Sequence, residues 1–448
     1  MNEMKLIDVC ERLVQIARKE GAAETEAYAE RTRDSSVRVR DGAVEELHQA
    51  ASKGVGLRVI HNQRLGFAYG TDFSREGLTR LAQQALALAK GAARDEANGL
   101  PRGKLLGSGG EGQYDHAIEQ ISPEWKLQAA RSPERGAKAE DARIRKFDST
   151  GAGDFLAHAA IASSRGAHGE SKASYAYVYC SPVAEQDGQL QTASWSDTRR
   201  RLVTLQDPEY VGRTAARRAA RMLGAKKAAT QRVPVVFDPR MAAGFIGGLA
   251  DAVNGLLVHK KSSFFCGLKG KRIAPKGFTL LDDATLPMGI ATRPFDGEGV
   301  TSQTTPIVED GVLRNFLYDA TTARKAKSKT TGSASRGWAS LPSIGTSNFY
   351  LKPGTRKPDE IVKEMKNGFY VTAMLGRGAD VVTGDYSRGA NGIWIENGEL
   401  AWPVQEVTVS GNLLEMLKGI DAIGDDLDFR SSTAAPTLRF AELQVSGA

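Results

Sequence analysis

The chain has few cysteines and few histidines, and neither type is clustered. Its three cysteines, Cys10, Cys180 and Cys266, stand far apart in 448 residues, which excludes a disulfide framework and a Cys-x-x-Cys metal motif. We expect them to be reduced core thiols. No two of the six histidines fall within five residues of each other. This spacing argues against a local histidine-based metal motif.

Long hydrophobic runs are also absent. No stretch of 18 consecutive apolar residues occurs, so no transmembrane helix is predicted. The first residues, MNEMKLIDVCERLVQIARKEGA, mix acidic with apolar positions, unlike a signal peptide. A hydrophobic share of 41% and a charged share of 25% are typical of a soluble globular protein. The sequence therefore predicts a cytoplasmic protein without a membrane partner.

The net charge of +7 raises the question of an anionic partner. Basic residues are densest between positions 198 and 232, and on an expected helix near 212–223 the arginines recur three or four residues apart. A solvated helix face and a nucleic-acid surface both fit this pattern. We favour the solvated face, because no aromatic side chains alternate with these charges to stack on bases.

The order of the expected elements predicts an α+β fold. It has helix and antiparallel-sheet layers at the N-terminus and a β-rich C-terminal domain that carries one buried helix. A helix at 4–20, an antiparallel meander over 26–70 and a helix after Ser74 fill the first part. The predicted divisions are an N-terminal α+β domain (1–93), a Gly-rich connector (94–114), a middle α+β segment packed with the N-terminal domain (115–230), and the β-rich domain (231–448).

Turn residues give further expectations about the connector and the C-terminal domain. Asn397-Gly398, between two alternating runs, predicts a tight β-hairpin. The basic, Ser/Gly-rich segment 324–354 is either disordered or a functional lid. GSGGEG at 107–112 is a weak candidate for phosphate binding, because it neither follows an apolar strand nor opens an apolar helix.

Residues 238–265, DPRMAAGFIGGLADAVNGLLVHKKSSFF, predict a long buried helix in the C-terminal domain. Asp-Pro is a good N-cap and first-turn pair, and apolar residues follow at helical spacing. Four glycines interrupt this pattern, and each costs a helix interior about 1 kcal/mol relative to alanine. Close packing or a geometric demand would explain them. They are Gly244, Gly247, Gly248 and Gly255.

Three other places carry candidate chemistry. Asp296 and Glu298 in FDGEG are either an acid/base pair or, as we favour, part of a tight turn. Asp385, Tyr386, Ser387 and Arg388 lie in GDYSRG, but no histidine follows His259 that would activate the serine. Trp338 is the best aromatic candidate for contact with a substrate or partner.

The full chain resembles the TldD/PmbA proteins, once described as modulators of DNA gyrase and now understood as metallopeptidases and their partner subunits. The segments that carry the resemblance are RPFDGEGV from 293, EDGVLRNFLYDATTARK from 309 and VTGDYSRGANGIWIENGE from 382. The last is similar to the PmbA branch, also called TldE. The resemblance implies that the GDYSRG and FDGEG loops shape a peptide-binding cavity.

The resemblance also implies where a metal site would have been. In the TldD branch an H-E-x-x-x-H helix and a C-terminal cysteine hold zinc, and the glutamate is the general base. Aligned on HKKSSFF, the first histidine falls at Gly247, the glutamate at Gly248 and the second histidine at Ala252, and no cysteine follows Cys266. None of these residues supplies a zinc ligand. The resemblance therefore implies a vacated active site.

We expect from this a non-catalytic subunit of a heteromeric zinc metallopeptidase that processes unfolded peptides. A TldD-like partner would hold the zinc and carry out hydrolysis, and this chain would hold no cofactor; in isolation it could form a homodimer. Two alternatives stay open: a regulator of DNA gyrase or of nucleic acid, and an autonomous metal-independent hydrolase. The peptide-groove candidates are Asp296, Glu298, Trp338, Asp385, Tyr386 and Arg388.

Overall fold

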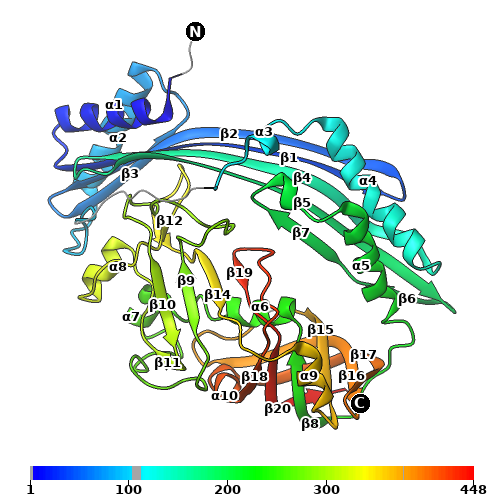
Figure 1. Cartoon of the computed structure of the whole chain (residues 1–448). Coiled ribbons are helices and arrows are strands. Elements are labelled where there is room, and N and C mark those ends of the chain that lie inside the picture. The colour runs from blue at the N-terminus through cyan, green and yellow to red at the C-terminus, as the bar shows by residue number, and fades with distance from the viewer. Residues whose placement is uncertain (1–3, 103–111, 377, 448) are drawn as a thin grey trace.

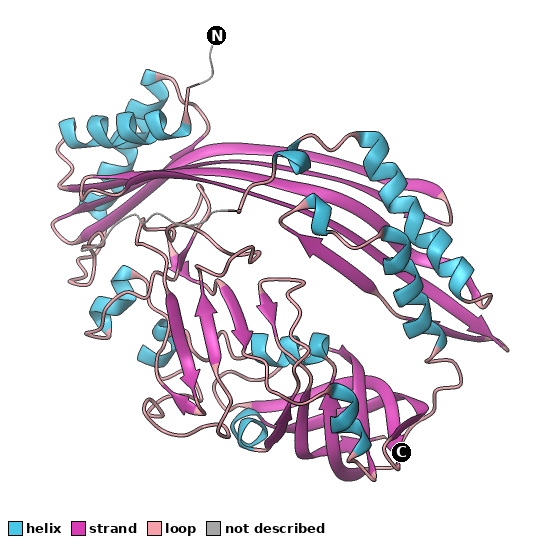
Figure 2. Cartoon of the chain, viewed as in Figure 1, coloured by secondary structure: helices cyan, strands magenta, loops and turns pink. Residues whose placement is uncertain are grey.

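The computed structural model describes residues 4–102, 112–376 and 378–447. One long antiparallel sheet lies like a roof over a C-terminal part whose described residues form three smaller sheets and short helices (Figures 1 and 2). The predicted α+β fold is confirmed. Residues 107–111 of the GSGGEG motif lie outside the described ranges. Within those ranges no helix is long and apolar enough to cross a membrane.

The roof sheet joins the N-terminal and middle segments of the chain. Its strand order is β3-β2-β1-β4-β5-β6, with β7 also paired to β5. The predicted meander is present, with turns at Asp41-Gly42 and Asn62-Gln63, all at positive φ. In β5 buried residues recur at every second position, because alternate side chains point to opposite faces. The strands are β1 Glu24–Arg40, β2 Ala43–His61, β3 Arg64–Gly70, β4 Ile144–Ser163, β5 His168–Gln186, β6 Gln189–Thr192 and β7 Trp195–Arg199.

Helices cover the two ends of the roof sheet. At one end α1 (Leu6–Lys19) and α2 (Arg75–Gly91) bury apolar side chains against β1 to β4. At the other end α4 (Pro123–Glu140) and α5 (Pro208–Ala220) pack on each other and on β4 and β5. Two shorter elements, α3 (His116–Glu119) and the 3₁₀ turn η1 (Leu202–Thr204), lie in the connections. The three cysteines are free, and Cys10 and Cys180 are buried.

A closed ring of strands forms the base of the C-terminal part. The sheet order is β17-β16-β15-β8-β20-β18, and an additional β17–β20 pairing closes five of these strands into a ring. Asn397 and Gly398 both have positive φ between β16 and β17, so the predicted hairpin is confirmed. The strands are β8 Gln231–Phe237, β15 Asn367–Leu375, β16 Asp385–Glu396, β17 Glu399–Asn412, β18 Ile420–Ile423 and β20 Leu438–Ser446.

A second sheet, of order β11-β10-β9-β14-β19, stands between the ring and the roof. The segment 324–354, expected to be disordered or a lid, instead contributes β12, β13 and the buried strand β14. The disordered alternative is wrong, because β14 pairs with β9 and β19 in this sheet; the lid alternative stays a prediction for the residues before β14. The strands of this sheet are β9 Leu280–Asp283, β10 Thr304–Glu309, β11 Val312–Leu313, β14 Asn348–Leu351 and β19 Thr433–Ala434. β12 Ala334–Ser335 and β13 Ser343–Ile344 pair with each other in a separate two-stranded sheet.

The predicted long helix over 238–265 is broken into two. Helix α6 spans Pro239–Gly247, turns follow, and α7 spans Gly255–His259. The break has a tertiary cause: Gly255 N donates to Leu317 O (2.9 Å) and Leu317 N donates to Val253 O (2.9 Å). A neighbouring segment thus takes the backbone groups that a continuous helix would use. The described C-terminal part also contains three further short helices, α8 Ala320–Lys325, α9 Pro358–Lys363 and α10 Leu413–Lys418.

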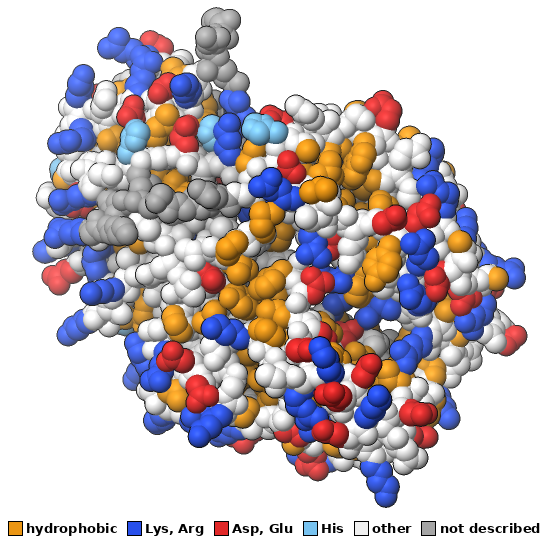
Figure 3. All heavy atoms as spheres, viewed as in Figure 1, with side chains coloured by type: hydrophobic (Ala, Val, Ile, Leu, Met, Phe, Trp, Pro, Cys, Tyr) orange, Lys and Arg blue, Asp and Glu red, His pale blue; other side chains and the backbone are white. Residues whose placement is uncertain are grey.

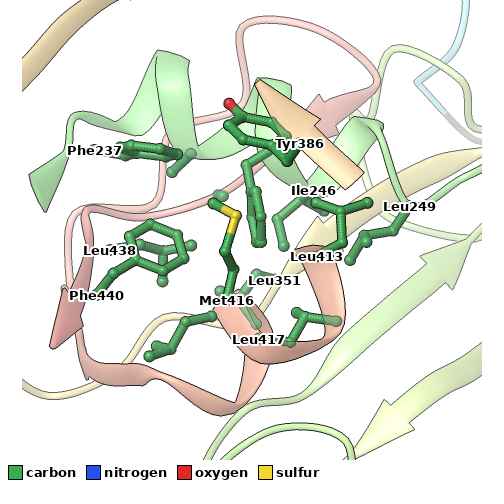
Figure 4. Packing of buried hydrophobic residues seen from close by; sticks show 14 of the residues in the cluster. Phe237, Ile246, Leu249, Leu351, Tyr386, Leu413, Met416, Leu417, Leu438 and Phe440 are labelled. Atoms are coloured by element: carbon green, nitrogen blue, oxygen red, sulfur yellow. The ribbon is translucent and has the colours of Figure 1, made fainter. Parts of the chain in front are cut away.

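The main hydrophobic core lies where α6 meets the ring. Phe440 lies between Phe237 and Phe245, with ring centroids 4.7 and 5.2 Å away. Ile246, Met416 and other apolar side chains complete this cluster (Figure 4). Fully burying one such side chain stabilises the fold by about 1.5–3 kcal/mol. The core therefore fixes the orientation of α6, and with it the side chains that α6 turns toward the roof.

Candidate functional site

Helix α6 lies on the side of the C-terminal part that faces the roof sheet (Figure 1). Asp238 caps it, because its carboxylate accepts a hydrogen bond from Met241 N at 2.9 Å. Ala242, Phe245 and Ile246 are buried in the core. The opposite face carries Gly244, and it is exposed. The exposed face of α6 at Gly244 therefore carries little side-chain bulk and lies on the side of the roof sheet.

Three of the four glycines are not required by packing within the chain. A Cβ atom on Gly244 would meet no atom within 4 Å, and one on Gly247 would only touch the Thr433 methyl group at 3.6 Å. At Gly248 a Cβ would lie 3.3 Å from Phe245 O, a close contact with one carbonyl. Only Gly255 is tightly packed, since its Cβ would lie 2.2 Å from the Tyr318 ring. The expectation of close packing therefore holds for Gly255 alone.

Two cavities adjoin the first turn of α6. One, of about 450 Å³, lies between Trp195 and Ser196 of β7, α6, and the chain near Arg430. The other, of about 330 Å³, reaches the apolar side chains Met222, Met241 and Met374. Arg218 and Arg240 line both cavities. In the space-filling view a hollow opens between the roof and the C-terminal part, with basic and acidic side chains around it (Figure 3).

The residues at the positions of a zinc site do not fit a metal ion. Gly247 and Gly248 have no side chains, and Ala252 is fully buried in the turn after α6. Cys266 lies with its Sγ 3.5 Å from Val258 O. Within the described ranges no three His, Cys, Asp or Glu side chains come together to hold a metal. Catalytic zinc needs three protein ligands of this kind.

Asp296 and Glu298 lie in a buried junction between the roof and the C-terminal part. Both are 1% exposed. Glu298 binds Arg58 of β2 (2.7 Å) and accepts a hydrogen bond from Ala320 N (2.8 Å). Arg58 also binds Glu26 of β1 (2.9 Å). The Arg58–Glu298 pair joins the two parts of the molecule, and burial leaves neither Asp296 nor Glu298 open to a peptide.

Asp296 shows the electrostatic cost of this junction. Its Oδ1 accepts hydrogen bonds from Glu298 N and Val300 N, both at 2.9 Å, and its Oδ2 accepts one from Ala334 N at 3.0 Å. This geometry is the tight turn that the sequence favoured. Burial, followed by the nearby charge of Glu298, raises the pKa of Asp296 to about 7.

The GDYSRG residues divide between the core and the surface. Tyr386 is buried, with its ring 6.3 Å from that of Phe245. Asp385 is exposed at the start of β16 and accepts a hydrogen bond from Thr383 Oγ1 at 2.9 Å. Arg388 donates to Gly376 O at 3.2 Å. Tyr386 thus packs against the buried face of α6 through Phe245. Neither Asp385 nor Arg388 lines the two cavities beside α6.

Trp338 packs on the roof sheet of its own chain. Its Nε1 donates to Ser52 Oγ at 3.2 Å, and its ring meets Tyr69 edge-on at 5.7 Å. It also covers Gly54 of β2, where a Cβ would lie 2.3 Å from the indole. The side chain stays partly exposed. Its main contacts are therefore internal, and they help to join the loop between β12 and β13 to the roof.

The arginines of α5 and its surroundings are mostly neutralised within the chain. Arg217 pairs with Glu140 at 3.2 Å, Arg213 lies 3.7 Å from Glu209, and Arg218 binds Asp238 at 2.8 Å. Paired cations release few counterions on binding DNA. This arrangement fits a solvated, ion-paired helix face better than a nucleic-acid surface.

The sequence analysis missed Trp195, Arg240 and Arg430, which meet beside α6. They come from β7, the first turn of α6 and the chain before β19, so no local spacing could have brought them together. Their only local signals are the helix-opening Asp-Pro-Arg at 238–240 and a tryptophan in the arginine-rich region.

Models of known protein families match all three parts of the chain. A model described as PmbA/TldA metallopeptidase domain 1 matches residues 25–89, the central-domain model matches 116–223, and the C-terminal-domain model matches 230–447. The chain is thus a three-part protein of the metallopeptidase class. Metalloprotease PmbA of Escherichia coli O157:H7 is 32% identical over 94% of this chain and 92% of its own length. The chain belongs to the PmbA/TldD family.

Solved structures agree with this assignment. A putative modulator of a DNA gyrase from Thermotoga maritima is 26% identical to this chain, with a TM-score of 0.90. The match covers 99% of this chain and 100% of that one. TldE from Thermococcus kodakarensis shares the fold, with a TM-score of 0.89 at 22% identity over 98% of this chain and 99% of its own.

Proposed function

We propose that this chain is a non-catalytic, PmbA/TldE-like subunit of a heteromeric zinc metallopeptidase in the cytoplasm. A TldD-like partner holds the zinc and hydrolyses unfolded or flexible peptides. This chain contributes walls and peptide contacts. The observation that carries the proposal concerns the end of α6 and the turn after it. There this metallopeptidase-family chain has Gly247, Gly248 and Ala252 at the metal positions implied by the resemblance.

Three further observations support a non-catalytic role. The carboxylates Asp296 and Glu298 are both buried, Asp296 among backbone N–H donors of its own part and Glu298 against Arg58 of the roof, so they are not available for acid/base work on a substrate. Ser387 is exposed at the start of β16, and no histidine follows His259 in the sequence. The face of α6 with Gly244 is open, which leaves room for an extended peptide.

The test is co-expression with a family member from the same genome that carries an intact H-E-x-x-x-H. The tagged chain should co-purify with that member, and bound zinc and cleavage of an unfolded substrate such as reduced casein should appear in the complex only. Replacing the glutamate of the partner's motif by glutamine should abolish cleavage and leave the complex intact. Stoichiometric zinc and chelator-sensitive cleavage by the isolated chain would contradict the proposal.

A further inference from the structure

The cavity of about 450 Å³ beside α6 has three guanidinium groups around one indole ring. The Cζ atoms of Arg218, Arg240 and Arg430 lie 5.3, 5.5 and 3.9 Å from the centre of the Trp195 ring. Each contact is a cation–π interaction of the kind that favours arginine over aromatic faces. Trp195 itself is fixed by a hydrogen bond from Nε1 to Gln206 Oε1 at 3.3 Å. The indole ring of Trp195 therefore contacts three arginine side chains in the lining of this cavity.

Two of these cations are neutralised within the chain. Arg218 binds Asp238 at 2.8 Å, and Asp238 is also the N-cap of α6. Arg430 binds Asp428 at 2.7 Å. The remaining acid of the wall, Asp426, accepts hydrogen bonds from Thr437 N at 2.9 Å and Thr437 Oγ1 at 2.7 Å. Among the described residues, neither Asp426 nor either of these paired acids makes an ion pair with Arg240.

Arg240 is the exception. Its Nη1 donates to Ser194 O at 2.6 Å, and among the described residues no carboxylate lies within 4.0 Å of it. Burial, followed by the charge of Arg218, lowers the pKa of Arg240. A partly buried guanidinium without an ion pair keeps N–H donors and a charge that a ligand carboxylate can match. The guanidinium belongs to the first turn of α6, whose N-terminus is capped by Asp238.

The adjoining cavity indicates what else the ligand carries. It shares Arg218 and Arg240 with the first cavity, and Met222, Met241 and Met374 form an apolar part of its wall. Methionine side chains adapt to apolar groups of different shapes. A carboxylate next to an apolar side chain describes the end of a peptide better than it describes a free inorganic anion.

We propose that Arg240 binds a carboxylate of a flexible peptide, with the adjacent apolar side chain in the methionine-lined cavity. The inference rests on the proposed function, because it takes the ligand to be a peptide. Helix α6 rises about 10 Å from Arg240 to Gly247, the length of about three extended residues. A peptide anchored at Arg240 would therefore run along the open glycine face of α6.

Fluorescence anisotropy with the full isolated chain tests the proposal. The probes are three fluorescein-labelled peptides of about six residues made from Ser, Gly and Ala. One ends in Leu with a free carboxylate, the second is its C-terminal amide, and the third is an amide with Asp next to Leu. The free acid should bind at least about tenfold more tightly than the first amide, as expected for losing a charge-assisted contact. If the Asp amide binds as tightly as the free acid, a side-chain carboxylate is the source.

Arg240→Gln should remove the difference between the free acid and the amide. The matched control is Arg232→Gln, because Arg232 is an exposed arginine on β8 paired with Glu442 at 2.7 Å, away from both cavities. Equal affinities for acid and amide in the unaltered chain, or no binding of any probe at about millimolar protein, would overturn the proposal. Neither zinc nor the partner takes part in this assay. Its failure is therefore distinct from a failure to form the metallopeptidase complex.

Discussion

At the scale of single residues, the glycines of segment 238–265 differ in what they do. Gly244 lies inside the helix with open space where a Cβ would be, whereas Gly255 lies against Tyr318 and Leu317. Gly244 therefore lowers the stability of the helix without serving packing in this chain. The missing side chain at Gly244 therefore affects only the space available to a molecule that binds against α6.

Gly244→Ala should raise the free energy of unfolding by about 1 kcal/mol, because alanine has the higher helix propensity. Gly255→Ala is the matched control and should lower it by about 1–3 kcal/mol through overpacking against the Tyr318 ring. Urea denaturation of both variants measures the two changes. If Gly244→Ala is destabilising, an internal contact requires this glycine after all.

The buried carboxyl of Asp296 gives a pH-dependent prediction. Its folded pKa of about 7 lies above the unfolded value of about 3.9. The folded state therefore binds the extra proton between these values, and this group's contribution to stability falls as the pH rises from about 4 to 7. In Asp296→Asn this contribution is absent. The unfolding free energy of the variant, relative to the unaltered chain, should thus increase from pH 4 to pH 8.

Urea titrations at several pH values measure this difference. Asp385→Asn is the control, because Asp385 is exposed and its replacement should give a difference that changes little with pH. A flat difference for Asp296→Asn would mean that the carboxyl is ionised throughout, held by its three backbone N–H donors.

At the scale of elements, the sequence predicted those helices and strands whose ends are set by neighbouring residues in the chain. The hairpin at Asn397-Gly398 needs two residues at positive φ, and this pair supplies them. Helix α2 begins where Ser74 accepts a hydrogen bond from Gly77 N at 3.0 Å, as an N-cap does. Alternation over 26–70 likewise predicted a meander, because one face of those strands is covered by helices.

Elements decided by distant partners were not predictable in this way. The apolar periodicity of 238–265 continues past Gly247, but Leu317 pairs with the backbone at Val253 and Gly255 and ends the helix. Segment 324–354 has the composition of a loop, yet β14 inserts between β9 and β19. The cluster at Trp195 joins side chains more than two hundred residues apart. No spacing in the sequence encodes such a contact.

At the scale of the whole molecule, a buried charge network couples the roof to the C-terminal part. Arg58 from β2 lies between Glu26 of β1 and Glu298 (2.9 and 2.7 Å), and Arg336 binds the other oxygen of Glu26 at 2.6 Å. Burial acts to lower the pKa of Arg58, but the charges of Glu26 and Glu298 outweigh it and raise that pKa. Arg58 therefore stays charged. Two ion pairs of this network, Arg58–Glu298 and Arg336–Glu26, join the roof to the C-terminal part.

Arg58→Met should destabilise the protein by about 3–5 kcal/mol, because it leaves Glu26 and Glu298 buried with too few cations. Arg80→Met is the matched control: its partner Asp72 and Arg80 itself are both more than half exposed, and such a pair contributes less than about 1 kcal/mol. Urea denaturation measures both changes.

Adding Glu298→Gln to Arg58→Met should recover part of the loss, since it removes one unpaired charge from the junction. A cost for Arg58→Met no larger than that for Arg80→Met would show that the two parts hold together through apolar packing alone. The cavities beside α6 would then depend on the contacts of Trp338 and Phe295 with the roof rather than on this network.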